Sequence, residues 1–334
     1  MIYHSAEASR LLQPRRADNV TAWEGRPGMV VSALPLRVRW LLDGIAFNGA
    51  ADQLGREWVI DSETGWSASP PVRNDQTQPR TGAHGGWPPR TYRDPRTIRL
   101  DGWVYAPTWE ARRDAEHRLA ALCAEPGRKF ELRCTEETGE LLAHVTQDDT
   151  TLVSVRPGGQ WLDFSLQLVA ADPRKYTAVE HTAETGLPSE SVTGLTFGMD
   201  DVGGLDFALA GSGLDFGSQR DAGRATVANV GTADTAPGLA LLGPLAPPVT
   251  VSRPDNPAGR LIYLDPLGEN DRLVIDVRER TVRLGDVSRR HRTVVTDWDA
   301  FVVSPKATVD FVLSHGSVPN ATARLQVRWR AAWW

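Results

Sequence analysis

His84 is the residue of this sequence whose position best fits chemistry. It sits among glycines in a long segment with few apolar residues, where a histidine can act as a general base or as a metal ligand. The other six histidines are scattered along the chain without the pairing of a metal site. A lone histidine in such a loop more often serves as a hydrogen-bonding residue, and this is the favoured interpretation of His84.

A glycine-rich acidic stretch is the second candidate for chemistry. This stretch could suggest a calcium site, because it contains four aspartates: Asp200, Asp201, Asp206 and Asp215. Calcium needs six or more oxygen ligands that converge from a defined loop, and this spacing does not define one. A solvated linker is the preferred interpretation. The two carboxylates of a glycoside hydrolase need not be close in sequence, so this chemistry stays open. The sequence indicates no particular pair.

The common motifs of catalysis and cofactor binding are missing from the sequence. It contains no Walker loop, dinucleotide fingerprint, His-Glu-x-x-His, EF-hand, Cys-x-x-Cys or Gly-x-Ser-x-Gly pattern. We therefore predict no catalytic residue, no metal and no cofactor, and a protein that is not an enzyme.

The composition narrows the possible partners. The 334 residues carry a formal net charge of −5, so no basic surface argues for sequence-specific nucleic-acid binding. No apolar run in the sequence is long enough for a signal peptide or a membrane span. The two cysteines, Cys123 and Cys134, are predicted to be small buried apolar residues and not a disulfide. The 12 tryptophans suit cores and subunit interfaces.

Alternating apolar residues predict strands that would position the candidate residues. A half-buried strand is expected at 97–105, with Gly102 at a bulge or a close backbone approach. The clearest strand is expected at 161–170, and the single convincing helix at 108–124 with Thr108 as its N-cap. The polar segment 62–95 is too long for an ordinary connection, which indicates a functional loop or an interaction arm.

The whole chain is predicted to be mainly β and to divide into four parts. Turns about every ten residues after residue 223 indicate a β-sandwich, and the only helical pattern falls in the first half. The predicted parts are an N-terminal arm (1–35), a β domain with the helix (36–180), a glycine-rich linker with three Gly-Leu-x-Phe units (181–222) and a C-terminal sandwich (223–334).

Exposed aromatic and charged side chains are the third candidate, and the favoured one. Tryptophan beside arginine is the composition of the energetically dominant residues in protein interfaces. Several strands place apolar residues on one face and such side chains on the other. We expect these residues to contact a neighbouring subunit or partner: His84, Trp87, Arg99, Trp103, Tyr105, Trp333 and Trp334.

The order of these pieces resembles one family, the distal tail proteins of long-tailed phages and the minor tail proteins of actinobacterial phages. Each piece is short, but together they cover most of residues 36–334. In chain order the pieces are "LRVRWLLDG", "RTGAHGG…YRDPRTIRLDGWV", "TWEARRDAEHRLAALC", "WLDFSLQLVAADPRKY", "GLTF…GLDF…GLDF", "NVGTADTAPGLALLGPL", "NDRLVIDVRERTVRLGD" and "VRWRAAWW".

The resemblance implies a structural role in the virion. It implies an N-terminal β domain that assembles into a homohexameric ring and an outer C-terminal sandwich of galectin-like type. The ring would join the tail tube protein to the tape-measure and tail-tip hub proteins, with DNA passing through its lumen and no membrane involved. Such a protein would be assembled in the host cytoplasm and reside at the tail tip. The family offers no catalytic residue to transfer.

Two other functions stay open on the sequence alone. A carbohydrate-binding protein could use tryptophan and arginine on the C-terminal sandwich for attachment to the host surface. A cell-wall hydrolase would need an active site that the missing motifs do not supply, and loss of activity in a His84→Ala variant would revive that alternative.

Overall fold

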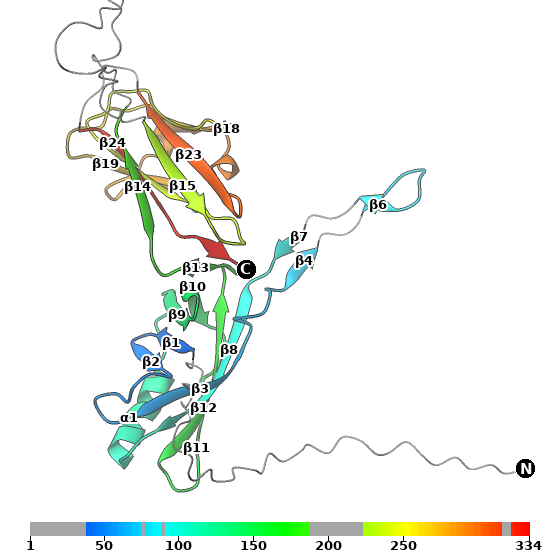
Figure 1. Ribbon diagram of the computed structural model, residues 1–334, viewed down its shortest axis with the longest axis vertical. Helices are drawn as coiled ribbons and strands as arrows, with labels where there is room; N and C mark the ends of the chain where they lie inside the picture. The colour runs from blue at the N-terminus through cyan, green and yellow to red at the C-terminus, as the bar shows by residue number, and fades with distance from the viewer. Residues whose placement is uncertain (1–37, 75–77, 88–90, 188–222, 316–321) are drawn as a thin grey trace, which may run out of the picture. The chain divides into compact units, whose positions relative to one another are not determined.

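The chain is mainly β, as its alternating patterns predict. The computed structural model describes residues 38–74, 78–87, 91–187, 223–315 and 322–334. The predicted N-terminal arm and the three Gly-Leu-x-Phe units lie outside the described residues. One α-helix accompanies the strands of the described part (Figure 1).

The first half of the chain builds a ten-stranded antiparallel sheet. It needs strands from distant parts of the sequence, because consecutive strands are not always neighbours. Across the sheet the order is β2 (Ile45–Phe47), β1 (Arg39–Leu42), β9 (Phe130–Glu136), β10 (Gly139–Gln147), β12 (Trp161–Ala170), β8 (Arg96–Tyr105) and β3 (Glu57–Thr64), with β11 (Leu152–Val155) beside β12 and β13 (Lys175–Thr177) between β10 and β25 (Ala332–Trp333).

Asn48 joins the two outer strands of this sheet, β2 and β3. Its backbone N–H donates to the carbonyl of Trp58 at 2.8 Å. Its side-chain amide accepts from the N–H of Ile60 at 2.9 Å and donates to the carbonyl of the same residue at 3.2 Å. The residue has a φ of 60°, which asparagine tolerates better than most residues. The sheet is therefore curled, and the backbone and side chain of one residue link its two edges.

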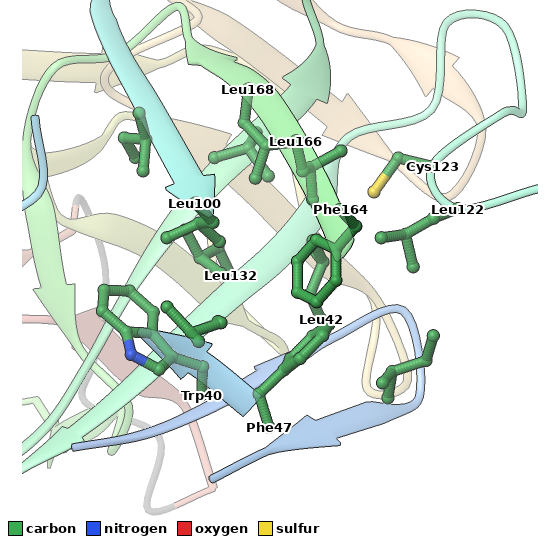
Figure 2. Close-up of a cluster of buried hydrophobic side chains, with 14 of the residues drawn as sticks. Trp40, Leu42, Phe47, Leu100, Leu122, Cys123, Leu132, Phe164, Leu166 and Leu168 are labelled. Atoms are coloured by element: carbon green, nitrogen blue, oxygen red, sulfur yellow. The ribbon is translucent and has the colours of Figure 1, made fainter. Parts of the chain in front are cut away.

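The inner face of the curled sheet carries the core of the first half (Figure 2). Trp40, Leu42, Leu100 and Leu132 are among its buried side chains, and Phe47 packs against Phe164 with ring centroids 5.7 Å apart. In β12 the inward residues are those that the alternation predicts, because every second position from 162 to 170 is buried.

The helix α1 (Trp109–Ala120) begins as predicted and ends four residues early. The Thr108 hydroxyl accepts a hydrogen bond from a backbone N–H in the first turn, as an N-cap does. At the other end Cys123 has a φ of 56°, and its N–H donates to the carboxylate of Asp43 at 3.1 Å. A residue in the left-handed region cannot continue a right-handed helix, so the predicted end at 124 is wrong.

Gly102 marks a close backbone approach, as expected. It lies opposite Ile60, where β3 contains one extra residue, Asp61, and the pairing with β8 shifts register. A Cβ at position 102 would lie 2.0 Å from the carbonyl oxygen of Val59. No other residue type fits this position without a shift of the backbone.

The second half of the chain is a sandwich of two antiparallel sheets with a shared core. Buried residues from both sheets, such as Ile275 and Phe311, belong to one cluster. One sheet runs in the order β14 (His181–Thr185), β24 (Arg324–Trp329), β16 (Gly238–Leu242), β19 (Arg272–Asp276), β20 (Thr281–Leu284) and β21 (Val287–Ser288), and the other in the order β15 (Arg224–Asn229), β23 (Ala307–Ser314), β17 (Val249–Arg253), β18 (Asn256–Tyr263) and β22 (Thr293–Val295).

The two halves share strands at their junction. Residues 181–185, which the sequence assigns to the linker, form β14 and pair with β24 of the sandwich. In the other direction, β25 follows the last long strand of the sandwich and pairs with β13 of the first sheet. Two turns of 3-10 helix, Arg290–Arg292 and Asp299–Phe301, complete the described part of the second half.

Candidate subunit-contact surfaces

The residues that could do catalytic chemistry are dispersed. Within the described ranges, no group of three or more histidine, cysteine, aspartate or glutamate side chains is placed to hold a metal ion. His84 lies exposed in the turn between two short strands, and the acidic stretch from Asp200 to Asp215 lies outside the part of the chain that the structure describes.

Both cysteines are free and buried, which confirms their prediction as apolar residues. Burial, and then the nearby Asp43 carboxylate, raises the pKa of Cys123 to about 12. Burial likewise raises the pKa of Cys134, with Glu136 adding to the effect. The thiolate is the nucleophile of cysteine chemistry, and at neutral pH both side chains are therefore unreactive thiols.

The described residues of the polar segment before β8 pair as a hairpin, which we call the extended hairpin (71–74, 78–87 and 91–94). β4 (Val72–Asn74) pairs with β7 (Thr91–Arg93), and farther along β5 (Gln78–Pro79) pairs with β6 (Gly86–Trp87) (Figure 1). The sequence predicts a loop here because the segment has few apolar residues. The segment nevertheless forms two short antiparallel strand pairs through its backbone.

His84 and Trp87 share the tip of the extended hairpin. The Trp87 side chain is 60 % exposed, and the guanidinium carbon of Arg80 lies 4.5 Å from the centroid of its ring. The backbone N–H of Arg80 donates to the carbonyl of Gly85 at 3.1 Å and closes the turn. The tip thus presents one cation and one large ring to its surroundings.

Arg96 fixes the root of the extended hairpin. Its side chain is 1 % exposed and donates to backbone carbonyls on both sides of the root. One terminal nitrogen donates to Gly65 at 2.5 Å and to Ala68 at 2.6 Å, while Nε donates to Pro173 at 2.9 Å. Burial lowers the pKa of this guanidinium, although Glu63 opposes the effect. This buried cation therefore holds the chain where the hairpin leaves the sheet.

A second buried cation supports the same root. Lys175 donates from Nζ to the carbonyl of Trp66 at 3.1 Å. The Trp66 ring is fully buried, and its indole N–H donates to Glu136 at 3.0 Å. Burial, reinforced by the charge of Arg96, lowers the pKa of Lys175. The root is thus built into the core, in contrast to the exposed tip.

The outer face of β8 carries the charged and aromatic residues that the sequence predicts there. Arg99 is exposed, and its Nε lies 3.0 Å from each carboxylate oxygen of Asp101. Trp103 and Tyr105 follow on the same face and are half-buried. Their pairing partners on β12 bring a third ring, Trp161, beside them.

Trp103, Tyr105 and Trp161 form what we call the aromatic patch. The ring centroid of Trp161 lies 4.9 Å from each of the other two centroids, with interplanar angles of 61° to Trp103 and 52° to Tyr105. Such tilted contacts are the favoured geometry of aromatic pairs. Opposite Trp103 on β3, Val59 is buried although it belongs to the outer face. The outer face therefore holds a small apolar cluster of its own.

An ion pair borders the aromatic patch. Arg156 donates to both carboxylate oxygens of Asp163, at 2.8 Å from Nε and 2.5 Å from a terminal nitrogen. Its guanidinium carbon also lies 5.9 Å from the ring centroid of Trp161. The hydrogen bond to Asp163, with a further contribution from the charge of Asp61, raises the pKa of Arg156.

Trp333 and Trp334 are half-buried by contacts within the chain. Trp333 belongs to β25 and lies opposite Lys175. The Trp334 ring has Arg93 of the extended hairpin and Arg174 as cationic neighbours, with guanidinium carbons 5.6 and 5.8 Å from its centroid. The two tryptophans therefore lie beside the hairpin root and away from Trp87, with which the sequence groups them.

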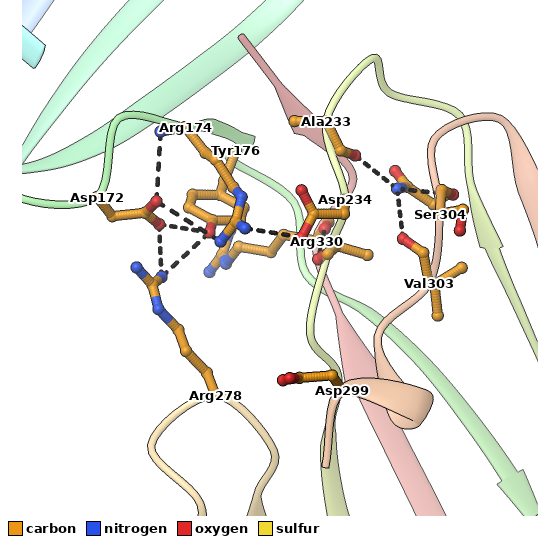
Figure 3. A network of polar contacts seen from close by, with 12 residues as sticks. Asp172, Arg174, Tyr176, Ala233, Asp234, Arg278, Asp299, Val303, Ser304 and Arg330 are labelled. Carbon is orange, nitrogen blue, oxygen red and sulfur yellow. Dashed lines mark hydrogen bonds and ion pairs between the residues drawn. The ribbon is translucent and has the colours of Figure 1, made fainter. Parts of the chain in front are cut away.

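A polar network that the sequence does not reveal joins the two halves of the chain (Figure 3). Asp172 lies 2.5 Å from a terminal nitrogen of Arg278 and accepts from the Tyr176 hydroxyl at 2.5 Å. Arg174 lies 2.7 Å from a carboxylate oxygen of Asp234. Burial, together with the Asp172 carboxylate, raises the pKa of Tyr176 to about 12.

The partners that join the two halves in this network are 60 or more residues apart in sequence. The only local sign of this network in the sequence is the segment "ADPRKY" (171–176), which is charged and ends the first domain. Its two partners come from turns of the sandwich that look like ordinary solvated loops, so periodicity cannot pair them.

None of the described residues belongs to a helix that is long and apolar enough to cross a membrane. No family model matches the chain, and no curated protein matches it. Solved structures do resemble it.

Chains of the phage P2 baseplate, in the activated conformation with calcium and with strontium, each match 87 % of this chain and 97 % of their own length. With 11 % identity and TM-scores of 0.44, they are too dissimilar to support an argument about the fold. The Dit protein of phage SPP1 matches 88 % of this chain and 98 % of its own, with a TM-score of 0.57 and 12 % identity. Its structure is described as a paradigm of the hub adsorption apparatus of phages that infect Gram-positive bacteria. The chain thus has the fold of a phage distal tail protein, the family that its sequence resembles.

Proposed function

We propose that the protein is a structural hub of a phage tail tip. In this role it forms a hexameric ring between the tail tube and the tip or baseplate proteins. The observation that carries the proposal is the likeness to SPP1 Dit, which extends over both halves of the chain and nearly all of the Dit protein. A match to one half alone would have supported a shared module and no common role.

The side chains of the described part support a contact role more than a catalytic one. Apolar and cationic residues are exposed on the extended hairpin, and an aromatic patch lies on the outer face of β8 and β12. A closed ring of one protein needs two different complementary surfaces on each subunit. The chain offers two such surfaces on its first half, so we assign ring formation to residues 36–180 and the outer position to the sandwich.

The remaining parts of the proposal concern partners. The ring would contact the tail tube protein on one side and the tape-measure and tail-tip hub proteins on the other, with DNA passing through the lumen. The formal net charge of −5 suits a passage that must not retain DNA. The galectin-like character of the sandwich belongs to the same proposal, as does its location in the virion and assembly in the host cytoplasm.

The carbohydrate-binding alternative is not supported by a specific feature. Sugar platforms are exposed aromatic rings, whereas the tryptophans described in the second half are buried or half-buried: Trp298, Trp329, Trp333 and Trp334. Among the described residues, the exposed tryptophans are Trp87 and Trp109, and both lie in the first half.

Native mass spectrometry of the full chain tests the proposed function. We expect a species of six subunits at micromolar concentration, and ring-shaped particles with a central hole by negative-stain microscopy. A three-dimensional reconstruction should place the curled sheet around the lumen and the sandwich outside. A monomer at every concentration tested, also in the presence of the tail tube protein, would contradict the proposal.

A further inference from the structure

The extended hairpin is an exposed element without a core of its own. Trp87, Tyr92 and Val72 are 60, 46 and 45 % exposed, which is unusual for large apolar side chains on one short segment. Its described residues 78–87 and 91–93 carry two arginines, Arg80 and Arg93, and one histidine, and none of them is acidic. Within the described residues, the contacts of the Arg80 and Trp87 side chains are with each other.

The aromatic patch offers the complementary surface. Four acidic residues belong to the paired strands around its three rings: Glu57 opposite Tyr105, Asp163 opposite Trp103, and Asp61 and Asp101 next to the bulge at Gly102. Asp101 and Asp163 are paired with arginines, whereas Glu57 and Asp61 are exposed and form no ion pair in the described part of the chain. Asp61 is the extra residue of β3 at the bulge, between Ile60, which pairs with Gly102, and Ser62, which pairs with Asp101.

The hairpin and the aromatic patch of one chain belong to opposite ends of β8. The hairpin leaves the sheet at the Arg96 end, whereas the patch occupies the Trp103–Tyr105 end. At about 3.3 Å per residue, the seven to nine residues between them span roughly 23–30 Å. Arg96 and Lys175 hold the chain just before the hairpin through buried hydrogen bonds to residues 65–68.

We propose that the hairpin tip of one copy, with Arg80 and Trp87, docks on the aromatic patch of a second copy and pairs with its Glu57 and Asp61. The occupant is a second copy because the two surfaces differ and are opposite in charge, which gives the head-to-tail contact that closes a ring. The inference rests on the proposed function, since it names the contact that would hold the ring together. Tryptophan and arginine are the residue types that most often dominate such contacts.

Photo-cross-linking of the full chain tests where the tip docks. Trp87 is replaced by benzoylphenylalanine, and protein grown with light isotopes is mixed with protein grown with heavy isotopes before assembly. We expect cross-links between position 87 and peptides that contain Trp103 or Trp161, in mixed light–heavy pairs that identify two different chains. If rings form but their cross-links lead to another surface, stay within one chain or are absent, the proposed docking site is wrong. These outcomes would leave the hub proposal intact.

Charge reversal provides the independent test. Arg80→Glu and Asp61→Arg should each raise the concentration at which rings dissociate, and the double variant should restore it. Arg128→Glu is the matched control, because Arg128 is exposed and lies outside the hairpin and the patch. Trp87→Ala should raise the same concentration about thirty-fold, the loss expected for a dominant interface residue. Independent effects of the two charge reversals, with no rescue, would contradict the pairing, whereas absence of rings in the unmodified protein would contradict the hub itself.

Discussion

Because Gly102 has no Cβ atom, β3 and β8 can approach each other closely at the bulge. The carbonyl oxygen of Val59 occupies the space that a Cβ would need, so an added methyl must displace the backbone of β3. The patch residue Trp103 is the next residue along β8. Backbone geometry at 102 and side-chain placement at 103 are thus coupled.

We expect Gly102→Ala to lower the free energy of unfolding by about 1–3 kcal/mol, because overpacking forces the surrounding chain to shift. Urea denaturation followed by tryptophan fluorescence measures the change. Gly238→Ala is the matched control, since Gly238 also lies in a strand but has no atom within 4 Å of its Cβ position. That control should be neutral or stabilising by about 0.5–1 kcal/mol. Equal effects of the two substitutions would contradict the close approach.

His144 makes the stability of the fold depend on pH. It faces Glu131 on β9 and lies near Arg278, Arg330 and Asp172. Burial lowers its pKa from the ordinary 6.5, and the two arginines lower it further against the opposing carboxylates. The unfolded chain therefore binds this proton first as the pH falls, and protonation favours unfolding.

We expect the free energy of unfolding to decrease as the pH falls below about 6.5 and to lose this dependence below the folded-state pKa of His144. In His144→Gln the dependence between pH 7 and 5 should be smaller. Urea denaturation across this range provides the measurement, and His84→Gln, at an exposed site, serves as the control. A steeper dependence in His144→Gln than in the unmodified protein would show that the sign is wrong.

At the scale of elements, the extended hairpin combines a rigid root with an exposed tip. Arg96 supplies donors to carbonyls that no other donor reaches in the described contacts, and Lys175 supplies one more to Trp66. We expect Arg96→Lys to lower the free energy of unfolding by at least about 1–3 kcal/mol, the cost of one buried carbonyl left without a donor.

The same substitution should loosen the root locally. Hydrogen exchange of residues 65–68 should become faster in Arg96→Lys, while exchange in β12 stays unchanged. Arg73→Lys is the control, because its ion pair with Asp94 is exposed and 3.7 Å long. Unchanged exchange at the root would mean that Arg96 does not position the hairpin.

The elements also show what can be predicted from sequence. The strands at 97–105 and 161–170 and the start of the helix follow from periodicity and capping, which are local, and their exposed faces follow from the same alternation. The turn after the helix is held by a carboxylate 80 residues away, since Asp43 accepts from the backbone N–H of Cys123. The ladders of the extended hairpin depend on backbone pairing in a segment without apolar periodicity. Long-range partners of this kind leave no local pattern.

The candidate site divides in the same way. Trp103 and Tyr105 could be placed on an outer face from alternation, but their contact with Trp161 requires the register between β8 and β12. Trp333 and Trp334 could not be placed at the hairpin root, because that position depends on the pairing of β25 with a strand from the first half.

At the scale of the whole molecule, the network around Asp172 connects the two halves. Asp172 and Arg278 come from different halves, and the pair is partly shielded from solvent. A double-mutant cycle with Asp172→Ala and Arg278→Ala should give a coupling of about 0.5–3 kcal/mol, measured by urea denaturation. The exposed pair Arg280–Asp299 is the control and should give about 0.2–1 kcal/mol. A coupling no larger than the control would show that the network does not hold the halves together.

The pairing of β25 with β13 has a consequence for synthesis of the protein in the cell. When the first half has left the ribosome, β13 still lacks one partner, which arrives with residues 332–333. At 5–20 residues per second, the delay for the intervening roughly 150 residues is about 10–30 seconds. A chain interrupted before that point leaves β13 with an open edge, and open strand edges pair with other chains. Synthesis through residue 333 is therefore a condition for a finished first sheet, and chains that terminate earlier are expected to aggregate instead of joining an assembly.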